Sequence, residues 1–484
     1  MSKNSYELSK ENDDSVKLED YNPSYSSELN SIKNRNYIKY AFILNIKTNI
    51  LIIILFIGLF ISEFYFREPL FDKSITFEEK WQDKSSDSTI KFFKFITKVG
   101  GEYLTAVPVS FVLVFYTLIQ SSFYIAGFLF ILHFHSLMKI WYGSSRPFWE
   151  NTKLYKGIAD GGFGNPSGHT ITTIYLHLTL FFYLRETFLN KKYKYQIIIL
   201  LFFIIFIILV ILSRIILGIH SLNQVLYGSG LGIFSSLLIT HILKLHQMPM
   251  LFYKKLFKDK VIIFCISGIL SLLILISILS CLFFNSNFNE DRYDQILKEL
   301  TDLPKYRKFN LDGLFGSFAA VAILGMYLGQ VIFWYFIDKT YKANKENKSG
   351  TKIDFIINDN DNDNAELKGI EKEYFEEDDN NGLIDNLINN WNKNRSFKLC
   401  SLFRFIKLIF IAIICFSPLI FFLIIPKDIN TVLIFIFKFG IPFFFTLFFT
   451  YSFGFFYLIK IFCGEKEDLL KRVNDKIRYN NNIV

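Results

Sequence analysis

Three short clusters of cationic, imidazole and amide side chains stand out within an otherwise apolar part of this sequence. Lys139 is followed after six residues by Arg146-Pro147, a Gly-Asn-Pro-Ser-Gly-His run ends at His169, and Ser213-Arg214 is followed by His220 and then by Gln224. Charged and imidazole groups near membrane-spanning segments are costly, so those that are kept there usually have a task. The three clusters are therefore where chemistry is expected.

The side chains of these clusters suit a phosphoryl group. Lys139, Arg146 and Arg214 are permanent cations, and a guanidinium fork matches phosphate oxygens in a bidentate manner. Ser167 and the Gly168 amide stand at the start of an expected helix, a usual position for bound phosphate. Two imidazoles can divide the roles of nucleophile and general acid at neutral pH. Because phosphoryl transfer depends on positioning and charge stabilisation, we predict a site that uses no metal and no cofactor.

The elements that carry the clusters are expected to cross a membrane. The chain has 484 residues, of which 51% are hydrophobic and 18% aromatic. A soluble core stops growing at roughly 250–300 residues, so much of this apolar surface has to lie in lipid. About ten stretches approach the length that spans a bilayer. They are residues 49–66, 103–119, 122–140, 170–186, 196–212, 222–244, 261–284, 313–337, 403–425 and 431–462.

The composition also excludes other classes of protein. Charged residues make up only 20% of the chain and are bunched between apolar runs, which excludes a disordered chain and a basic nucleic-acid-binding protein. The five cysteines show no paired spacing that indicates a zinc site or a disulfide framework. No carboxylate cluster is expected beside the three clusters, which argues against a magnesium or two-metal site.

The distribution of Lys and Arg predicts the orientation of the chain. These residues collect before the first expected span, between the fourth and fifth, between the sixth and seventh, and after the last. Ten passes place all four segments on the cytosolic side, as the positive-inside rule requires. Both termini are then cytosolic, and the three clusters converge on the lumenal or extracytoplasmic side. We expect an integral protein of the endoplasmic reticulum, another endomembrane or the plasma membrane.

This topology divides an all-α polytopic membrane protein into five parts. They are a disordered cytosolic tail (1–45), a six-span core (46–245), two additional spans with a lumenal loop (246–337), an acidic cytosolic loop (338–400), and two C-terminal spans with a basic cytosolic tail (401–484). The six-span core holds all three clusters, so the chemistry is assigned to it.

Taken together, the clusters resemble the signature of the type-2 phosphatidic acid phosphatase superfamily. That signature reads Lys, six residues, Arg-Pro; then Pro-Ser-Gly-His; then Ser-Arg, five residues, His, three residues, Asp. The sequence agrees at every position except the last, where Gln224 stands in place of Asp. The resemblance covers roughly residues 100–245 and implies a six-helix phosphatase core.

The resemblance implies a role for each matching residue. His220 would attack phosphorus and form a phosphohistidine, and His169 would protonate the leaving alcohol and then activate water. The phosphoryl oxygens would be held by Lys139, Arg146, Ser167, Gly168 and Arg214. Gln224 would orient His220 from one helical turn away. Its amide oxygen accepts a hydrogen bond but brings no negative charge, so we expect weaker or differently tuned activity.

Three functions stay open from the sequence. The first is hydrolysis of a lipid phosphate such as phosphatidate, lysophosphatidate or a sphingoid-base phosphate, because a site at the bilayer edge is reached by lateral diffusion. Gln224 and the pair Phe148-Trp149 are similar to the glucose-6-phosphatase branch, which raises a soluble sugar phosphate as the second. The third is a non-catalytic membrane protein that binds phosphate lipids, and the intact His169 and His220 argue against it. No nucleic-acid partner is expected, and the oligomeric state is left open.

Overall fold

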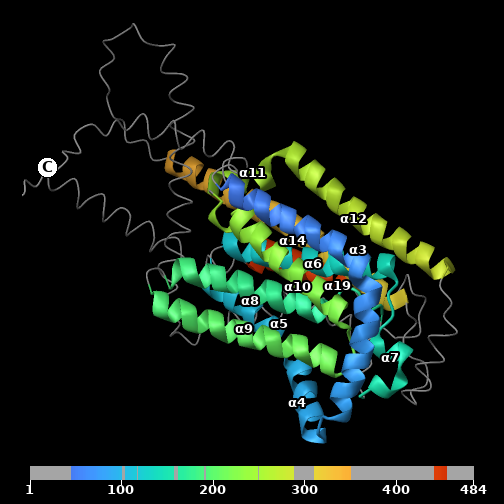
Figure 1. Ribbon diagram of the computed structural model, residues 1–484. Coiled ribbons are helices and arrows are strands. Elements are labelled where there is room, and N and C mark those ends of the chain that lie inside the picture. The colour runs from blue at the N-terminus through green and yellow to red at the C-terminus, as the bar shows by residue number, and fades with distance from the viewer. Residues whose placement is uncertain are drawn as a thin grey trace, which may run out of the picture.

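The computed structural model describes residues 45–100, 104–116, 118–156, 162–189, 192–248, 250–287, 310–349 and 441–454. All regular elements within these ranges are helices, in agreement with the expected all-α class (Figure 1). The expected N-terminal tail, most of the acidic loop, the expected span 403–425 and the basic C-terminal tail lie outside the described residues.

Six helices form the part of the chain that was expected to be the core. They are α3 (Ile46–Asp83), α5 (Leu104–Phe115), α6 (Leu118–Tyr142), α8 (Gly168–Thr187), α9 (Tyr193–Ile216) and α10 (Leu222–Leu237). The short helices α4 (Asp87–Lys98) and α7 (Pro147–Glu150) and the 3-10 turns Thr152–Leu154 and Leu245–Gln247 belong to the same region. The π-helical turn Leu238–Ile242 follows α10. Beyond it lie α11 (Met250–Lys258), α12 (Lys260–Asn287), α14 (Asn310–Ser349) and α19 (Ile441–Phe449), which ends in the π-helical turn Thr450–Gly454.

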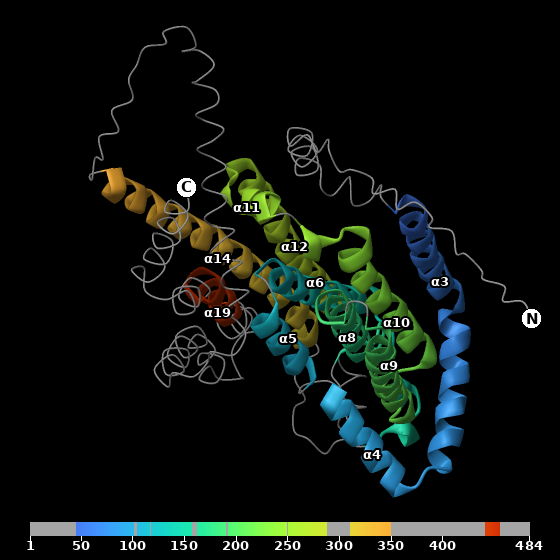
Figure 2. The same ribbon diagram turned by 90° about the vertical axis from the view of Figure 1, so that its left-hand side faces the viewer.

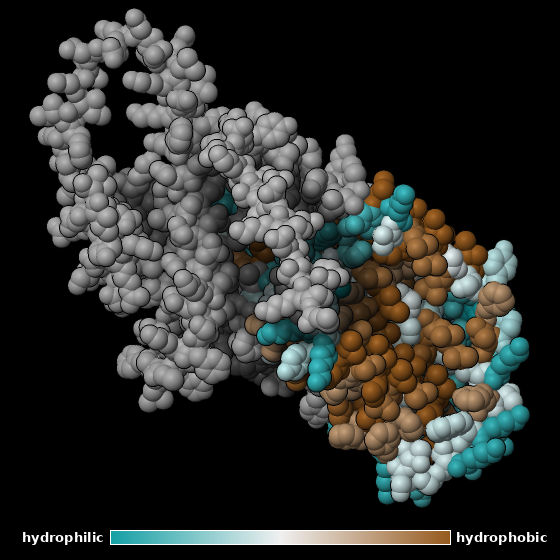
Figure 3. Space-filling view, turned by 60° about the vertical axis from the view of Figure 1, so that its left-hand side comes forward, coloured by the Kyte–Doolittle hydropathy of each residue, from teal (hydrophilic) through white to brown (hydrophobic). Residues whose placement is uncertain are grey.

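Several of these helices are built to face lipid. In the described part of the chain, six segments are long and apolar enough to cross a membrane: Ile46–Asp83, Leu118–Glu150, Tyr193–Ile216, Leu222–Gln247, Lys260–Ser280 and Ala319–Lys339. In α9 and α12 only 11% of the most apolar window is buried in the protein, against 50% in the span containing α6. An apolar helix that is mostly uncovered satisfies its own backbone and needs lipid around its side chains. Figure 3 shows such a surface, a broad apolar face with hydrophilic side chains at its margins.

Within the described residues, the bounds of the spans differ from the sequence expectation. About ten spans were expected over the whole chain, and six segments of the described ranges meet the length and hydropathy of a span. The segment expected to span at 103–119 forms α5, which has only 12 residues and contains Pro108. Helix α8 is 20 residues long but buries polar side chains, including Thr170, Thr173 and Thr179. It packs against α5, α6, α9 and α10, so its surface does not have to be apolar throughout.

Helix α3 is much longer than the expected span 49–66. Its 38 residues correspond to about 57 Å of helix, roughly twice the thickness of the hydrocarbon layer. Pro69 lies inside the helix, and Figure 1 shows α3 changing direction partway along its length. Proline is a common cause of such bends because it removes a backbone hydrogen bond. The apolar first half of α3 is therefore long enough by itself to cross the hydrocarbon layer, and the second half belongs to one end of the bundle.

Close backbone contacts set the spacing of the core helices. A Cβ on Gly228 of α10 would lie 2.9 Å from the carbonyl oxygen of Ser167, and one on Gly232 would lie 2.9 Å from that of Ile171. Small residues allow such an approach, which brings the start of α8 against α10. The hydroxyl of Tyr124 on α6 donates to the carbonyl of Leu176 at 2.8 Å and so joins α6 to α8.

Helices α14 and α19 pack on the other side of the core from α3 (Figure 2). Figure 2 shows α3 and α14 on opposite flanks, with α6, α8 and α10 between them. Helix α14 contacts α6, α12 and α19. Gly325 and Gly329, one turn apart on α14, are in close contact with the backbone of Phe444 and Phe448. The expected boundary of the acidic loop at residue 338 falls inside α14, which continues to Ser349.

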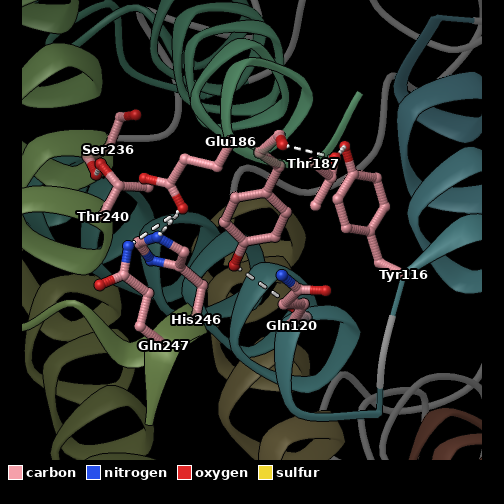
Figure 4. Close-up of polar contacts among 9 residues, drawn as sticks. Tyr116, Gln120, Glu186, Thr187, Ser236, Thr240, His246 and Gln247 are labelled. Atoms are coloured by element: carbon pink, nitrogen blue, oxygen red, sulfur yellow. Dashed lines mark hydrogen bonds and ion pairs between the residues drawn. The ribbon is translucent and has the colours of Figure 1, made fainter. Parts of the chain in front are cut away.

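One end of the bundle is closed by a polar cluster around the C-terminus of α8 (Figure 4). Glu186 lies 2.6 Å from His246 Nε2, and Gln247 Nε2 donates to the same carboxylate oxygen at 3.1 Å. The Tyr116 hydroxyl is 3.1 Å from Thr187 Oγ1. These contacts join the end of α8 to the turn after α10 and to the end of α5. The three sequence clusters lie at the other end, called the site end below.

Candidate active site

Arg146 joins the first sequence cluster to the third. It precedes α7 and is only 1% exposed. Its Nε donates to the carbonyl of Gly162 at 2.8 Å, and its Nη1 donates to the carbonyl of Ile219 at 3.2 Å. The same Nη1 lies 3.3 Å from His220 Nε2. A buried guanidinium therefore holds together the loop before α8 and the loop that carries His220.

The hydrogen bonds of Gln224 determine the tautomer of His220. His220 Nδ1 lies 3.1 Å from Gln224 Oε1, and the backbone N–H of Ser221 donates to the same oxygen at 3.3 Å. Gln224 Nε2 donates to the carbonyl of Ser145 at 2.8 Å. A backbone N–H can only donate, so Oε1 is the acceptor and a neutral His220 carries its proton on Nδ1. The lone pair of Nε2 is then directed toward the Arg146 side.

The start of α10 explains why Gln224 is so placed. Ser221 is the N-cap residue and Gln224 occupies the third helical position, and the two form a capping box. In a capping box the side chain at this position returns to the N-cap backbone, which keeps it at the helix start. Gly164 packs directly against the Gln224 amide, and a Cβ there would overlap it. The glycine before Asn165 therefore makes room for the side chain that orients His220.

The second cluster lies at the N-terminus of α8. Ser167 is the N-cap residue and is fully buried. Its backbone N–H donates to the carbonyl of Gln224 at 3.1 Å, and its hydroxyl accepts from Thr170 Oγ1 at 3.0 Å. Gly168 and His169 occupy the first turn and are partly buried. The structure therefore joins the second cluster to the third through the backbone.

Lys139 and Arg214 approach the site end from two other helices. Lys139 is partly buried in the last turn of α6. His135 lies one turn earlier on α6. A Cβ added to Gly168 would be 2.8 Å from His135 Nε2, so this part of α6 is beside the first turn of α8. Arg214 is 1% exposed near the end of α9, and its Nη1 donates to Thr97 Oγ1 of α4 at 2.6 Å.

A tight turn carries the chain from Arg214 to His220. The backbone N–H groups of Ile219 and His220 donate to the carbonyl of Arg214 at 3.1 and 3.2 Å. Gly218 has a φ of +67°, and a Cβ on it would lie 2.7 Å from the carbonyl oxygen of Leu154. Both the left-handed backbone and the close approach require glycine here.

A buried carboxylate that the sequence analysis did not single out also lies at this end. Glu63 of α3 is 6% exposed, and its Oε1 accepts from Asn165 Nδ2 at 2.6 Å and from Asn223 Nδ2 at 3.4 Å. One amide belongs to the second cluster and the other lies within the segment of the third cluster, between His220 and Gln224. The signal was present in the sequence, because Glu63 is an ionisable residue inside the expected span 49–66, and such a residue indicates a buried partner.

The second half of α3 continues this contact with the third cluster. The backbone N–H of Leu222 donates to Ser74 Oγ at 2.8 Å, and Ser74 donates to Glu78 at 2.6 Å. Gln82 Nε2 donates to the carbonyl of Ile216 at 2.8 Å. One face of α3 therefore holds both sides of the turn that carries His220. A span ending at residue 66 would not have supplied these residues.

The fold and these contacts define a class of protein, an integral helical membrane protein with a buried site of imidazole, guanidinium and amide groups at one end of its bundle. Residues 109–247 match the family model of the PAP2 superfamily. The resemblance drawn from the three clusters is thereby confirmed for this segment.

The chain was also compared with curated proteins and with solved structures. No curated protein matches the chain. Among solved structures, the chain is similar to a transmembrane PAP2 type phosphatidylglycerolphosphate phosphatase from Bacillus subtilis. The two are 16% identical, the match covers 40% of this chain and 93% of that one, and the TM-score is 0.34.

Proposed function

We propose that the chain is a membrane phosphatase that hydrolyses lipid phosphomonoesters through a phosphohistidine on His220, without a metal ion. The match of residues 109–247 to the PAP2 superfamily supports a membrane phosphatase. The observation that carries the proposal is the placement of His220, whose Nδ1 lies 3.1 Å from Gln224 Oε1 while its Nε2 lies 3.3 Å from Arg146 Nη1. An imidazole held in this arrangement has its nucleophilic nitrogen next to a group that binds phosphate oxygens.

The proposed reaction has two steps. In the first, His220 Nε2 forms a bond to phosphorus, the bond from phosphorus to the alcohol oxygen breaks, and His169 gives that oxygen a proton. In the second, His169 takes a proton from water, which attacks phosphorus and releases phosphate and His220. Lys139, Arg146 and Arg214 stabilise the phosphoryl oxygens, and the first turn of α8 adds its N-terminal dipole.

Gln224 orients the nucleophile in this scheme but leaves its positive charge uncompensated. When Nε2 bonds to phosphorus, the imidazole becomes cationic, and the amide oxygen at 3.1 Å from Nδ1 offers only a dipole. A carboxylate at that place would stabilise the cation more strongly. The proposal therefore includes slow formation of the phosphohistidine.

A sugar phosphate is the second candidate, because Gln224 and Phe148-Trp149 are similar to the glucose-6-phosphatase branch. In the structure, Phe148 is 0% exposed and its ring centroid lies 5.9 Å from that of Tyr155. The ring of Trp149 lies 6.2 Å from that of Phe163. These packing contacts support the loop that carries Arg146, so the aromatic pair gives no separate argument for a sugar. The lipid substrate is preferred.

Phosphate release by the purified protein in lipid vesicles tests the proposal. The panel contains phosphatidate, lysophosphatidate, a sphingoid-base phosphate and glucose 6-phosphate, each with EDTA. We expect release from at least one lipid phosphate, complete loss in His220→Ala, and at least a hundredfold loss in Arg146→Lys, on the order of a lost bidentate contact. Release that disappears with EDTA would overturn the metal-free mechanism. Release from glucose 6-phosphate alone would establish the second candidate, and no release at all would favour a binding protein.

A further inference from the structure

In the second half of α3, polar side chains are buried and aromatic side chains are exposed, which is the reverse of the usual arrangement in a helix surrounded by water. Its polar residues Ser74, Glu78 and Gln82 are buried against the site end, at 3%, 0% and 7% exposure. Its aromatic residues Phe77 and Trp81 point outward, with 55% and 37% exposure. A surface that exposes aromatic rings while burying a carboxylate is expected where the surroundings are partly apolar.

Helix α4 has a related outer surface. Its inner face is apolar, and Phe93 packs with Ile216, Leu217 and Ile219 at the end of α9. Phe92 and Phe95 nevertheless lie on the outer face with 47% and 63% exposure. Three lysines stand beside these rings, namely Lys91, Lys94 and Lys98. Exposed rings among lysines are the composition of helices that lie in the interface of a membrane with anionic lipids.

The position of this segment agrees with an interfacial location. Residues 70–98, which form the second half of α3 and α4, are called the α3–α4 hairpin here. Figure 1 shows the hairpin extending from the site end and running across the direction of α9 and α10, and Figure 2 also shows it beyond the end of α9. A segment that leaves the end of a spanning bundle in this direction follows the plane of the membrane surface.

We propose that the α3–α4 hairpin is a docking surface for the anionic lipid head groups of the membrane at the site end. Phe92 and Phe95 insert at the boundary of the acyl chains, and the lysines of α4 bind the lipid phosphates. This inference rests on the proposed function and specifies its substrate as a phosphomonoester still carried by the bilayer. The hairpin reaches the site directly, because Thr97 on the inner face of α4 accepts a hydrogen bond from Arg214 at 2.6 Å.

The depth of the hairpin in lipid is the first measurement, and it does not depend on catalysis. A nitroxide is attached to Phe92→Cys or Phe95→Cys in full-length protein whose own cysteines are replaced, reconstituted in vesicles containing phosphatidylglycerol. Lys192→Cys, at an exposed position just before α9 at the other end of the bundle, is the water reference, and Phe202→Cys on α9 is the lipid reference. We expect oxygen to broaden the signals at 92 and 95 and a water-soluble nickel chelate to be excluded, as at 202. Chelate access equal to that at 192 would overturn the proposal.

The second measurement compares substrates. Phe92→Ser/Phe95→Ser is expected to lower phosphate release from vesicle-borne phosphatidate on the order of tenfold, because two inserted rings are lost. Release from the soluble ester p-nitrophenyl phosphate is expected to stay unchanged. Phe130→Ser/Phe202→Ser is the matched control, since these rings are 46% and 65% exposed on α6 and α9. It should change both rates by the same factor.

The outcomes separate this inference from the proposed function. If Phe92→Ser/Phe95→Ser leaves the ratio of the phosphatidate rate to the p-nitrophenyl phosphate rate unchanged, the docking surface is overturned. Hydrolysis of either ester by the parent protein would still uphold the phosphatase. If the parent protein hydrolysed neither ester, the phosphatase would fail, and the nitroxide depths would still decide whether the hairpin lies among lipid head groups.

Discussion

Glu63 offers the sharpest test of how the site is assembled, because one buried carboxylate contacts residues on two distant loops. Its Oε1 accepts from Asn165 Nδ2 at 2.6 Å and from Asn223 Nδ2 at 3.4 Å. Asn165 precedes the first turn of α8, and Asn223 is next to Gln224 in α10. Replacing Glu63 with Leu removes the acceptor while keeping much of the volume. Both amides then lose their shared partner in a buried place.

The size of the effect follows from these contacts. A hydrogen bond contributes about 0.5–1.5 kcal/mol, and a buried donor left without a partner costs about 1–3 kcal/mol. The long contact to Asn223 counts for little, so we take about 2–3 kcal/mol for the pair. If the transition state needs both loops in place, each 1.36 kcal/mol lowers the rate tenfold, which gives a loss of roughly 30- to 150-fold. Glu63→Gln keeps an acceptor oxygen and should lose only about three- to tenfold.

The assay is phosphate release at saturating substrate, together with thermal unfolding of each variant in the same vesicles. Glu79→Gln is the matched control, since that carboxylate lies on the same helix, is partly exposed and pairs with Lys153 at 3.6 Å. Its rate should stay within twofold of the parent, as expected for a surface ion pair. Two results would each refute this prediction: a Glu63→Leu rate equal to that of the parent protein, or a Glu63→Leu rate higher than that of Glu63→Gln.

Three further changes have expected outcomes that the same assays check. Gln224→Leu removes the acceptor at His220 Nδ1 and the donor to Ser145, so kcat should fall roughly 30-fold or more with little change in KM, and an unaltered kcat would argue against an orienting role. Gly218→Ala should lower the midpoint of thermal unfolding by costing about 1–2 kcal/mol in backbone strain, because φ is +67° there. Gly58→Ala is its control, since nothing lies within 4 Å of the added Cβ. Glu186→Leu at the far end removes the acceptor of the 2.6 Å contact with His246 and should lower stability by about 1–3 kcal/mol without changing KM, so a changed KM would contradict a purely structural role.

The sequence was informative wherever the signal was local. Apolar runs predict helices because backbone groups in lipid have to bond within their own segment, and α6, α9, α10 and α12 lie where such runs were found. The prediction of helices from the sequence was wrong where a helix is surrounded by other helices and not by lipid. Helix α5 is too short for the span expected there, and α4 was not expected as a helix at all. The spacing of the three clusters could be read directly, but the contacts made by their side chains could not.

What the sequence by itself determined is therefore the class of protein and the types of group at its candidate site, since hydropathy and short motifs depend on neighbouring residues. Only the tertiary structure decided how the groups are held. Glu63 finds its partners 102 and 160 positions further along the chain, and Arg214 finds Thr97 at a separation of 117. The tautomer of His220 depends on Gln224 and Ser145, which meet only when α10 packs beside the loop before α7. Because burying a charged or amide group is costly, the sequence indicates that such a group has a hydrogen-bond partner. Which residue is the partner depends on how the helices pack.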